Sequence, residues 1–402
     1  MRLLLVSSWF PFPPDNGSKL RAYNILRELS KHHTLTLLSF AEPHEAAPEH
    51  LEPLNEICET VTIVRGHPFK HGRLGLAGLL SEMPRSFVQT YSAEMKACVD
   101  RALPGHDLAI GLEVGSALYL RDIHAVPRVF EGAEVTWLRA RRDLEQDLAR
   151  RFRLMLTWRK YSRFIRDMVA SFERTTVVSD VEREAFIRMG CDPARVSVVP
   201  NGVAGADAAP ATSPETRLPR LIYPGAMTYS ANHDAVRMFL TSIWPLIRRA
   251  RPTLSFWVTG STTGVDMRSL PAGEGVTFTG HVADVKQLVA ESAACVVPLR
   301  TGGGTRLKIL EAMDLGTPVV STSKGAEGLA VTPDRDILIA DRPEEFAGQV
   351  LRLLDDPGLA DRLSRNGRDL VQRLHTWDTI GRQLEKVIQE AVETFHQGRR
   401  PR

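Results

Sequence analysis

The sequence lacks paired cysteines, long apolar runs and a large net charge. Its four cysteines, Cys58, Cys98, Cys191 and Cys295, are scattered and form no C-x-x-C pair, so neither a disulfide framework nor a zinc site is expected. No apolar run approaches the length that spans a bilayer, and the first one is too short for a signal peptide. The formal net charge is only +3, which does not indicate a nucleic-acid partner. We therefore expect a cytoplasmic protein that binds no nucleic acid.

The chain does contain enough apolar sequence for two domains, with 402 residues of which 43% are hydrophobic. In its first half, short apolar runs typical of buried parallel strands alternate with helical patterns. The expected strands there are Leu3–Ser7, Leu35–Phe40, Val61–Val64, Leu108–Leu112, Val126–Phe130, Thr175–Ser179 and Val196–Val199. This βαβ rhythm predicts a doubly wound parallel sheet.

A stretch rich in Ala, Pro, Thr and Ser interrupts the rhythm, which then restarts. We expect a Rossmann-like domain over residues 1–205, an interdomain linker over 206–219 and a second Rossmann-like domain over 220–376. The long helical pattern in 377–402 could complete the second domain or cross back to the first. The predicted fold class is α/β, with two Rossmann-like domains and parallel sheets.

The stretch TGGGTRLKILEAMDLGTPVVS, Thr301–Ser321, joins three glycines to a predicted helix. The helix is expected from about Thr305 to Leu315, because Gly316 and then Pro318 form a typical stop signal. It follows a predicted strand, Ala294–Leu299, whose carboxyl end is where ligands bind in open α/β sheets.

On a helical wheel Gly304, Lys308, Glu311 and Ala312 share one face. Glycines allow close approach to the backbone, and a helix N-terminus with a lysine attracts anions. A carboxylate one turn further can accept hydrogen bonds from ribose hydroxyls. The combination suits a nucleoside diphosphate. A tight turn with solvated charges remains the alternative, because glycine-rich turns before helices are common.

Three segments resemble glycosyltransferase family 4, which comprises retaining enzymes of the GT-B fold. Residues Pro298–Leu329 resemble its donor-site region, with EAM-x-x-G-x-P-V-V at Glu311–Val320 as the most specific part. Residues 9–40 resemble the family's first strand, glycine loop and first helix, and residues 223–240 the start of its second domain. The resemblance implies two facing Rossmann-like domains that hold a nucleotide-sugar donor mainly through the second.

The resemblance also implies roles for individual residues. Glu311 corresponds to the glutamate that contacts the donor ribose, while Lys308 and Arg306 would stabilise the leaving diphosphate. Glu131 is a candidate acid or base, although a solvated loop carboxylate fits it equally well. No metal is expected, since the acidic pair Asp334 and Asp336 is typical of a solvated turn. The expected donor-binding residues are Gly17, Gly225, Asn232, Gly302, Gly303, Gly304, Thr305, Lys308 and Glu311.

The chain departs from the family pattern at three places. Gly303 stands where many members carry a first glutamate, with seven residues between it and the second. Residues 225–232 contain none of the basic residues that often follow the second domain's first strand, and residues 129–137 lack the frequent histidine. These departures keep two alternatives open: a nucleotide-sugar 2-epimerase of the same fold, and a non-catalytic GT-B binding subunit.

The acceptor would be a hydroxyl of a glycan, a lipid-linked sugar or a small molecule. Arg139–Arg166 is a basic stretch with aromatic residues, and it allows a peripheral contact with the inner face of an anionic membrane. The interspersed Asp143, Glu145 and Asp147 favour instead a solvated helix with its own ion pairs.

Overall fold

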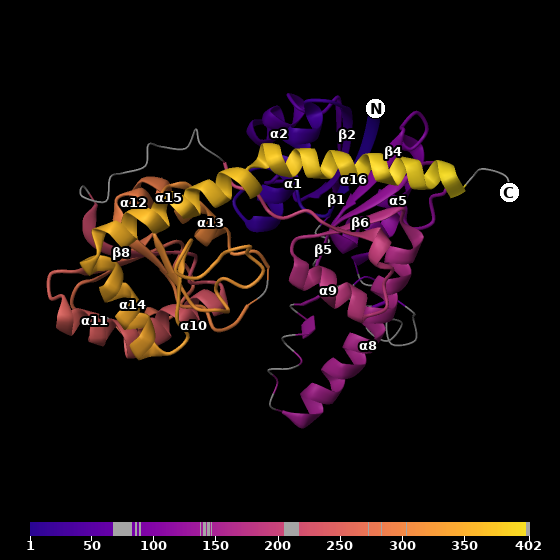
Figure 1. Cartoon of the computed structure of the whole chain (residues 1–402). Coiled ribbons are helices and arrows are strands. Elements are labelled where there is room, and N and C mark those ends of the chain that lie inside the picture. Colours follow the sequence, from indigo (N-terminus) through magenta and orange to yellow (C-terminus); the bar gives the residue numbers. More distant parts are fainter. Residues whose placement is uncertain are drawn as a thin grey trace. The chain divides into compact units, whose positions relative to one another are not determined.

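The structure, a computed structural model, describes residues 1–66, 83–84, 87, 90–136, 138–139, 142, 145, 147–204, 217–271, 273–282, 284–302 and 304–398. The chain divides into two compact units (Figure 1). Unit 1 comprises Met1–Asn201 and Trp377–Arg402, and unit 2 comprises Gly202–Thr376. Each is built around a parallel sheet, so the chain has a two-domain α/β architecture.

The sheet of unit 1 has the order β3-β2-β1-β4-β5-β6-β7, and each pairing is parallel. Continuous apolar strands fit this sheet because helices cover both of its faces. Its strands are β1 (Arg2–Ser7), β2 (Thr34–Ala41), β3 (Thr60–Arg65), β4 (Leu108–Leu112), β5 (Arg128–Ala133), β6 (Arg174–Val177) and β7 (Val196–Val198). Its helices include α1 (Gly17–Ser30), α2 (Pro48–Asn55), α5 (Ala93–Ala102), α6 (Glu113–Ala117), α8 (Leu148–Ser171), α9 (Asp180–Arg188) and α16 (Trp377–Gly398).

Helix α16 packs in unit 1 although it follows unit 2 in the sequence. Trp377, Ile380 and Leu384 are buried with residues of β1, β2 and α1 in one hydrophobic cluster. The His33 ring, just after α1, lies 2.8 Å from the Glu385 carboxylate. The helix is therefore an integral layer of unit 1.

The sheet of unit 2 has the order β10-β9-β8-β11-β12-β13, again with parallel pairings. Its strands are β8 (Leu218–Pro224), β9 (Ser255–Thr259), β10 (Val276–Gly280), β11 (Ser292–Val297), β12 (Val319–Ser321) and β13 (Leu338–Ile339). Its helices include α10 (Ser230–Met238), α11 (Trp244–Ala250), α12 (Val285–Ala290), α13 (Leu307–Asp314), α14 (Pro343–Asp355) and α15 (Pro357–Leu374).

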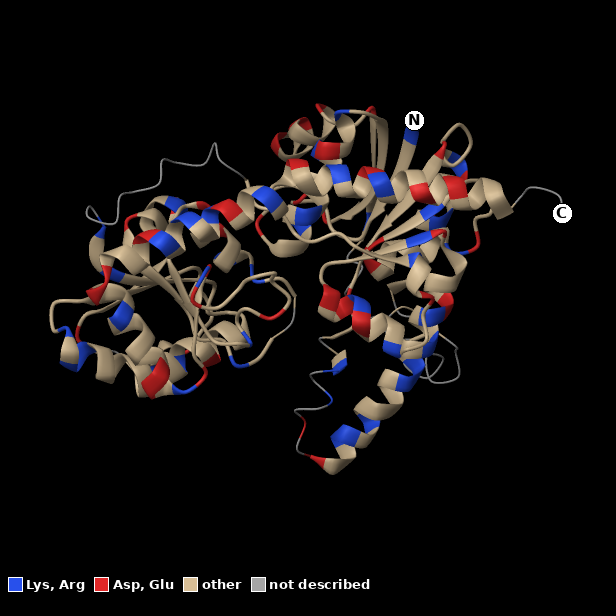
Figure 2. Ribbon diagram, viewed as in Figure 1, with Lys and Arg blue, Asp and Glu red and all other residues tan. Residues whose placement is uncertain are grey.

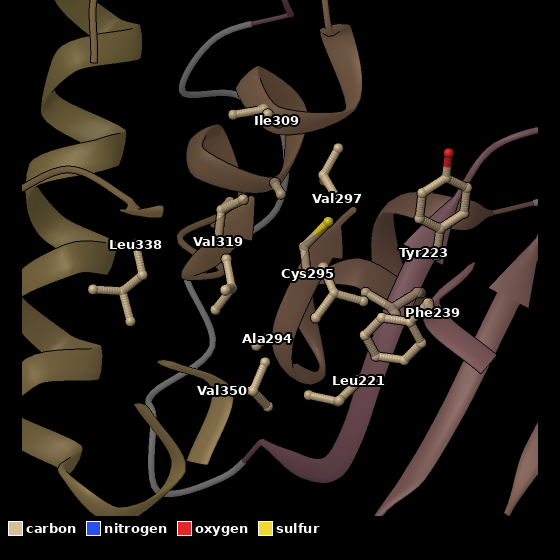
Figure 3. Packing of buried hydrophobic residues seen from close by; sticks show 14 of the residues in the cluster. Leu221, Tyr223, Phe239, Ala294, Cys295, Val297, Ile309, Val319, Leu338 and Val350 are labelled. Atoms are coloured by element: carbon tan, nitrogen blue, oxygen red, sulfur yellow. The ribbon is translucent and has the colours of Figure 1, made fainter. Parts of the chain in front are cut away.

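The core of unit 2 fixes α13 against the sheet. Ile309 of α13 is fully buried in the same cluster as Val297 of β11 and Val319 of β12 (Figure 3). Burying a side chain of this size contributes about 1.5–3 kcal/mol. The helix that carries Lys308 is therefore held firmly at the end of the strands.

Several predicted boundaries were wrong. Leu218 and Pro219, placed in the linker, belong to β8, while residues 205–216 of that region lie outside the described residues. The predicted strand Val126–Phe130 is displaced to Arg128–Ala133. A single helix is expected over Asp234–Arg249, but the structure has a π-helical segment within it at Phe239–Ile243. The two-residue strand β13 was not predicted, because so short a run has no periodicity.

Candidate functional site

In unit 2, the predicted donor residues gather where the strand order reverses. Strand β8 lies between β9 and β11, and the chain leaves β8 toward α10 and β11 toward α13. At such a switch point the loops beyond the carboxyl ends of two adjacent strands separate and leave room for a ligand. The structure thus brings Gly225 and Asn232, from the β8 side, next to Lys308, from the β11 side.

Lys308 is held by neutral partners. Its Nζ donates to Asn232 Oδ1 at 2.9 Å and lies 4.0 Å from the centroid of the Tyr223 ring. The Tyr223 hydroxyl donates to the same Oδ1 at 2.7 Å, and Asn232 Nδ2 donates to the Ala226 carbonyl at 2.9 Å. The cation–π contact and the hydrogen bond place the ammonium group without neutralising it. None of the described residues forms a salt bridge with it.

The surroundings make the lysine easier to deprotonate. Burial is the main cause, and the nearby Arg306 guanidinium acts in the same direction, so the pKa of Lys308 falls to about 7. Burial also raises the pKa of Glu311, although Lys286 and Lys308 oppose this. None of the described residues hydrogen-bonds to the Glu311 carboxylate. A buried charge normally has such partners, so both groups retain capacity for a ligand.

Gly225 leaves open the space that the Lys308 ammonium group occupies. A Cβ at Gly225 would lie 2.6 Å from Lys308 Nζ and 2.8 Å from Asn232 Nδ2. Both distances are far below van der Waals contact. The glycine therefore makes space for the ammonium group and its amide partner.

The Arg306 guanidinium is bound to the backbone of the glycine loop. Its Nη2 donates to the Gly302 carbonyl at 3.0 Å and its Nη1 to the Gly304 carbonyl. Gly302 and Gly304 have φ values of 106° and 74°, which favour glycine. Thr305 ends this loop, with its carbonyl accepting from the Leu307 N–H at 3.0 Å. Gly303 lies outside the described residues.

The helix begins two residues later than predicted, at Leu307. Arg306 is its N-cap, and no side chain caps the first turn. Gly304 consequently lies before the helix, and Ala312, assigned to the ligand-facing side, is fully buried. The shared face is therefore reduced to Lys308 and Glu311.

In unit 1, Gly17 opens α1 in a place where packing does not require glycine. A Cβ there would meet nothing within 4 Å. Asn16 caps the helix by accepting from the Lys19 N–H at 3.1 Å. The open space leaves the first turn of α1 accessible.

Glu131 was wrongly placed in a loop. It lies in β5, is 2% exposed and forms an ion pair with Arg21 of α1. Thr176 donates to the same carboxylate at 3.2 Å, and Arg21 also donates to Asn201 Oδ1 at 2.8 Å. A carboxylate so fully partnered is an internal counter-ion, and its proposed acid or base role stays a prediction.

The sequence reasoning missed Glu113, directly after β4. Its φ of 66° is unusual for a residue other than glycine. Its carboxylate accepts from Trp9 Nε1 at 3.0 Å. Burial is the main cause that raises its pKa to about 7, with the Glu131 charge adding to it and the Ser18 hydroxyl opposing it. The available signal was a carboxylate immediately after a buried apolar strand.

The two acidic residues near β13, Asp334 and Asp336, are both engaged by other protein groups. Asp336 is buried, and it accepts from the Thr332 N–H at 2.9 Å, which corrects the expectation of a solvated turn. Asp334 pairs with Arg352 at 2.6 Å. Within the described part of the chain, no group of three His, Cys, Asp or Glu side chains is arranged to hold a metal ion.

Known proteins resemble this chain in sequence and in fold. Residues 218–356 match the family Glycosyl transferases group 1. Glycogen synthase of Mycobacterium tuberculosis is 24% identical over 405 residues, covering 94% of this chain and 92% of that protein. The MMP alpha-(1->4)-mannosyltransferase of Mycolicibacterium hassiacum is 32% identical over 108 residues, 26% of each chain.

Among solved structures, Anabaena HepE in complex with UDP and glucose superposes with a TM-score of 0.69 at 15% identity. The match covers 97% of this chain and 99% of HepE. The shared architecture is that of GT-B glycosyltransferases, with two Rossmann-like domains. Together with the family match over unit 2 and the transferase relatives, it identifies this chain as a glycosyltransferase of the GT-B fold.

Proposed function

We propose that the enzyme transfers a sugar from a nucleoside-diphosphate donor to a hydroxyl acceptor with retention of configuration. The observation that carries this proposal is the pair Lys308 and Glu311 at the switch point of unit 2, a buried cation and a buried carboxylate that form no salt bridge with any of the described residues. The complexes of HepE with UDP and with UDP-glucose support a donor of this class. The acceptor would be a glycan, a lipid-linked sugar or a small molecule.

The donor diphosphate would lie against the loop Gly302–Thr305 and the uncapped first turn of α13. Negative charge grows on the diphosphate as the glycosidic bond breaks, and Lys308 would stabilise it. Arg306 would contribute by fixing the loop carbonyls. Glu311 would accept hydrogen bonds from the ribose hydroxyls.

The remaining predicted residues would position Lys308 or leave room for the ligand. Gly225 and Asn232 would hold the Lys308 ammonium in place. Gly17 would allow a ligand to approach the start of α1. Retention would follow from attack of the acceptor hydroxyl on the face that the diphosphate leaves, which needs no protein nucleophile.

The decisive experiment compares Lys308→Ala with Glu311→Gln. Because the diphosphate gains charge only in the transition state, Lys308→Ala should lower kcat by roughly ten- to a thousandfold. Ribose contacts change little along the reaction, so Glu311→Gln should mainly raise the donor KM. The rise corresponds to a loss of about 1–3 kcal/mol of donor-binding free energy. Thermal-shift screening of nucleotide sugars first identifies the donor. Lys386→Ala, an exposed change on α16, is the matched control. Wild-type kinetics in both variants would refute the proposed site.

We propose further that catalysis needs no divalent metal, because basic groups and backbone N–H groups meet the diphosphate. Activity should persist in EDTA. Loss in EDTA with specific recovery on adding Mn²⁺ or Mg²⁺ would contradict this.

Two controls separate the alternative functions. An epimerase would convert the donor with no acceptor present, whereas the transferase should leave its sugar configuration unchanged. A binding subunit would bind donor without turnover over a panel of acceptors.

A further inference from the structure

Helix α8, Leu148–Ser171, is buried only along its second half. Its buried residues begin at Tyr161, and no residue from Leu148 to Lys160 is buried. In Figure 1 the first turns of α8 extend beyond the strands of unit 1. The first half of the helix therefore stands in solvent.

That half exposes large apolar side chains in a regular pattern. Leu148, Phe152 and Leu156 are 80%, 59% and 49% exposed. Their spacing of four residues places them in one stripe. At 3.6 residues per turn, this stripe lies on the opposite side of the helix from Tyr161 and Met168, which are buried in the core. Tertiary packing thus does not account for it.

The same helix is strongly basic (Figure 2). Asp167 is its one acidic residue, so the charge is almost entirely of one sign. Exposed Arg159, Arg163 and Arg166 continue the apolar stripe along the same side of the helix. The seven basic residues are Arg150, Arg151, Arg153, Arg159, Lys160, Arg163 and Arg166.

The acidic residues that favoured a helix with its own ion pairs are not part of α8. The acidic residues Asp143, Glu145 and Asp147 all precede Leu148, where α8 begins. Asp147 is the N-cap and accepts from the Arg150 N–H at 2.7 Å. The basic face of α8 is therefore not balanced by acidic residues of the same helix.

We propose that α8 is a membrane-contact surface that binds an anionic lipid bilayer. The apolar stripe Leu148, Phe152 and Leu156 enters the interface, and the arginines along the same side contact lipid phosphates. An anionic bilayer satisfies both the apolar and the basic groups. Pairing with a second copy of α8 would bury the stripe but would bring like charges together.

The contact would be peripheral. No helix among the described residues is long and apolar enough to cross a bilayer. A short stripe combined with basic groups instead resembles helices that lie in the interface. Donor binding by unit 2 plays no part in this proposal, so the test needs no activity measurement.

The test is sedimentation of the full chain with vesicles. We compare two kinds of vesicle. One contains phosphatidylcholine with about 30% phosphatidylglycerol, whose headgroups give the surface a negative charge, and the other contains pure phosphatidylcholine. We expect binding to the anionic vesicles only, with loss at high salt as charges are screened.

The variant Phe152→Glu should weaken that binding roughly tenfold or more, because a large apolar side chain no longer enters the interface. The matched control is Leu246→Glu on α11, where the side chain is 41% exposed. It should bind as the wild type. Circular dichroism verifies that both variants fold.

Three results would overturn the proposal. Equal binding to both kinds of vesicle would remove the role of charge. Unchanged binding by Phe152→Glu would remove the role of the stripe. A wild-type dimer that Phe152→Glu dissociates in the absence of vesicles would assign the stripe to a second copy of the chain.

Discussion

Each unit has a buried cation near its sheet, and the two cations differ in the groups that surround them. In unit 1, Arg21 faces the Glu131 carboxylate and further acceptors, so its charge is neutralised inside the protein. In unit 2, Lys308 faces an amide oxygen and an aromatic ring. The first arrangement fixes the unit's own structure, whereas the second leaves a charge that an anionic ligand can neutralise.

We propose that this difference distinguishes a structural charge, Arg21, from a functional one, Lys308. Removing a partner from the first should mainly alter stability, and changing the second should mainly alter donor binding and catalysis. Four experiments test that distinction, in order of decreasing effect.

The largest effect should come from Arg21→Met. Glu131 would keep a buried negative charge without its cation, which costs about 3–5 kcal/mol of unfolding free energy. Urea denaturation measures the loss. The double variant Arg21→Met/Glu131→Leu should recover most of it, because neither charge remains. A single variant within about 1 kcal/mol of the wild type would show that the pair is not structural.

The next effect should come from Gly225→Ala. The added Cβ would displace the Lys308 ammonium and the Asn232 amide, with an overpacking cost of about 1–3 kcal/mol. Donor KM should rise and kcat should fall together. Gly348→Ala on α14 is the control, since a Cβ there meets nothing within 4 Å. Normal kinetics in Gly225→Ala would mean that the lysine position is unimportant.

A smaller effect is expected from pH. Free Lys308 loses its proton near pH 7, while a bound diphosphate favours the charged form. Donor binding above pH 7 should therefore take up a proton, and affinity should fall by up to about tenfold per pH unit. Calorimetry with UDP in buffers of different ionisation enthalpy measures the uptake.

The control for this pH effect is Lys308→Met, which should show no proton uptake of this origin. Stability has the opposite pH trend to affinity. Between pH 7 and the ordinary lysine value of 10.5, the unfolded chain holds the proton that the folded one has released. Unfolding free energy should thus rise with pH in this window. Identical proton uptake in wild type and variant would exclude Lys308 as its source.

The smallest effect should come from Glu113 of unit 1, whose backbone is in the left-handed conformation. Glu113→Ala keeps the φ of 66°, whereas Glu113→Gly relieves the left-handed conformation. Both lose the hydrogen bond that Trp9 Nε1 donates to the Glu113 carboxylate. The Gly variant should therefore be more stable than the Ala variant by about 1 kcal/mol. Thermal unfolding compares them, and a less stable Gly variant would disprove strain at this position.

Sequence patterns predicted the parallel sheets well because their strands are continuous apolar runs. Leu108–Leu112 was predicted to the residue, and α1, expected over about Ser18–Lys31, is displaced by one residue at each end. The predicted start of α13 was wrong because Thr305 and Arg306 belong to the glycine loop, and nothing in the sequence marks that boundary. Their conformation depends on carbonyls at Gly302 and Gly304, which propensity does not reveal.

The sequence proposed residues for the candidate site but could not show the contacts between them. Lys308 and Asn232 were both expected near the donor, yet nothing in the sequence joins side chains 76 positions apart. Arg21 and Glu131, 110 positions apart, illustrate the same limit. The positive φ of Glu113 was not predictable either, because glutamate does not favour it.

The placement of α16 has a consequence for how the chain folds as it is synthesised. Unit 2 is formed by contiguous residues, Gly202–Thr376, but unit 1 needs Trp377, Ile380 and Leu384 to complete its core. Domains usually fold in the order in which they leave the ribosome. Here unit 1 begins to be translated before unit 2 but is completed after it. Until α16 emerges, the surface of α1, β5 and β6 that it covers lacks its partner.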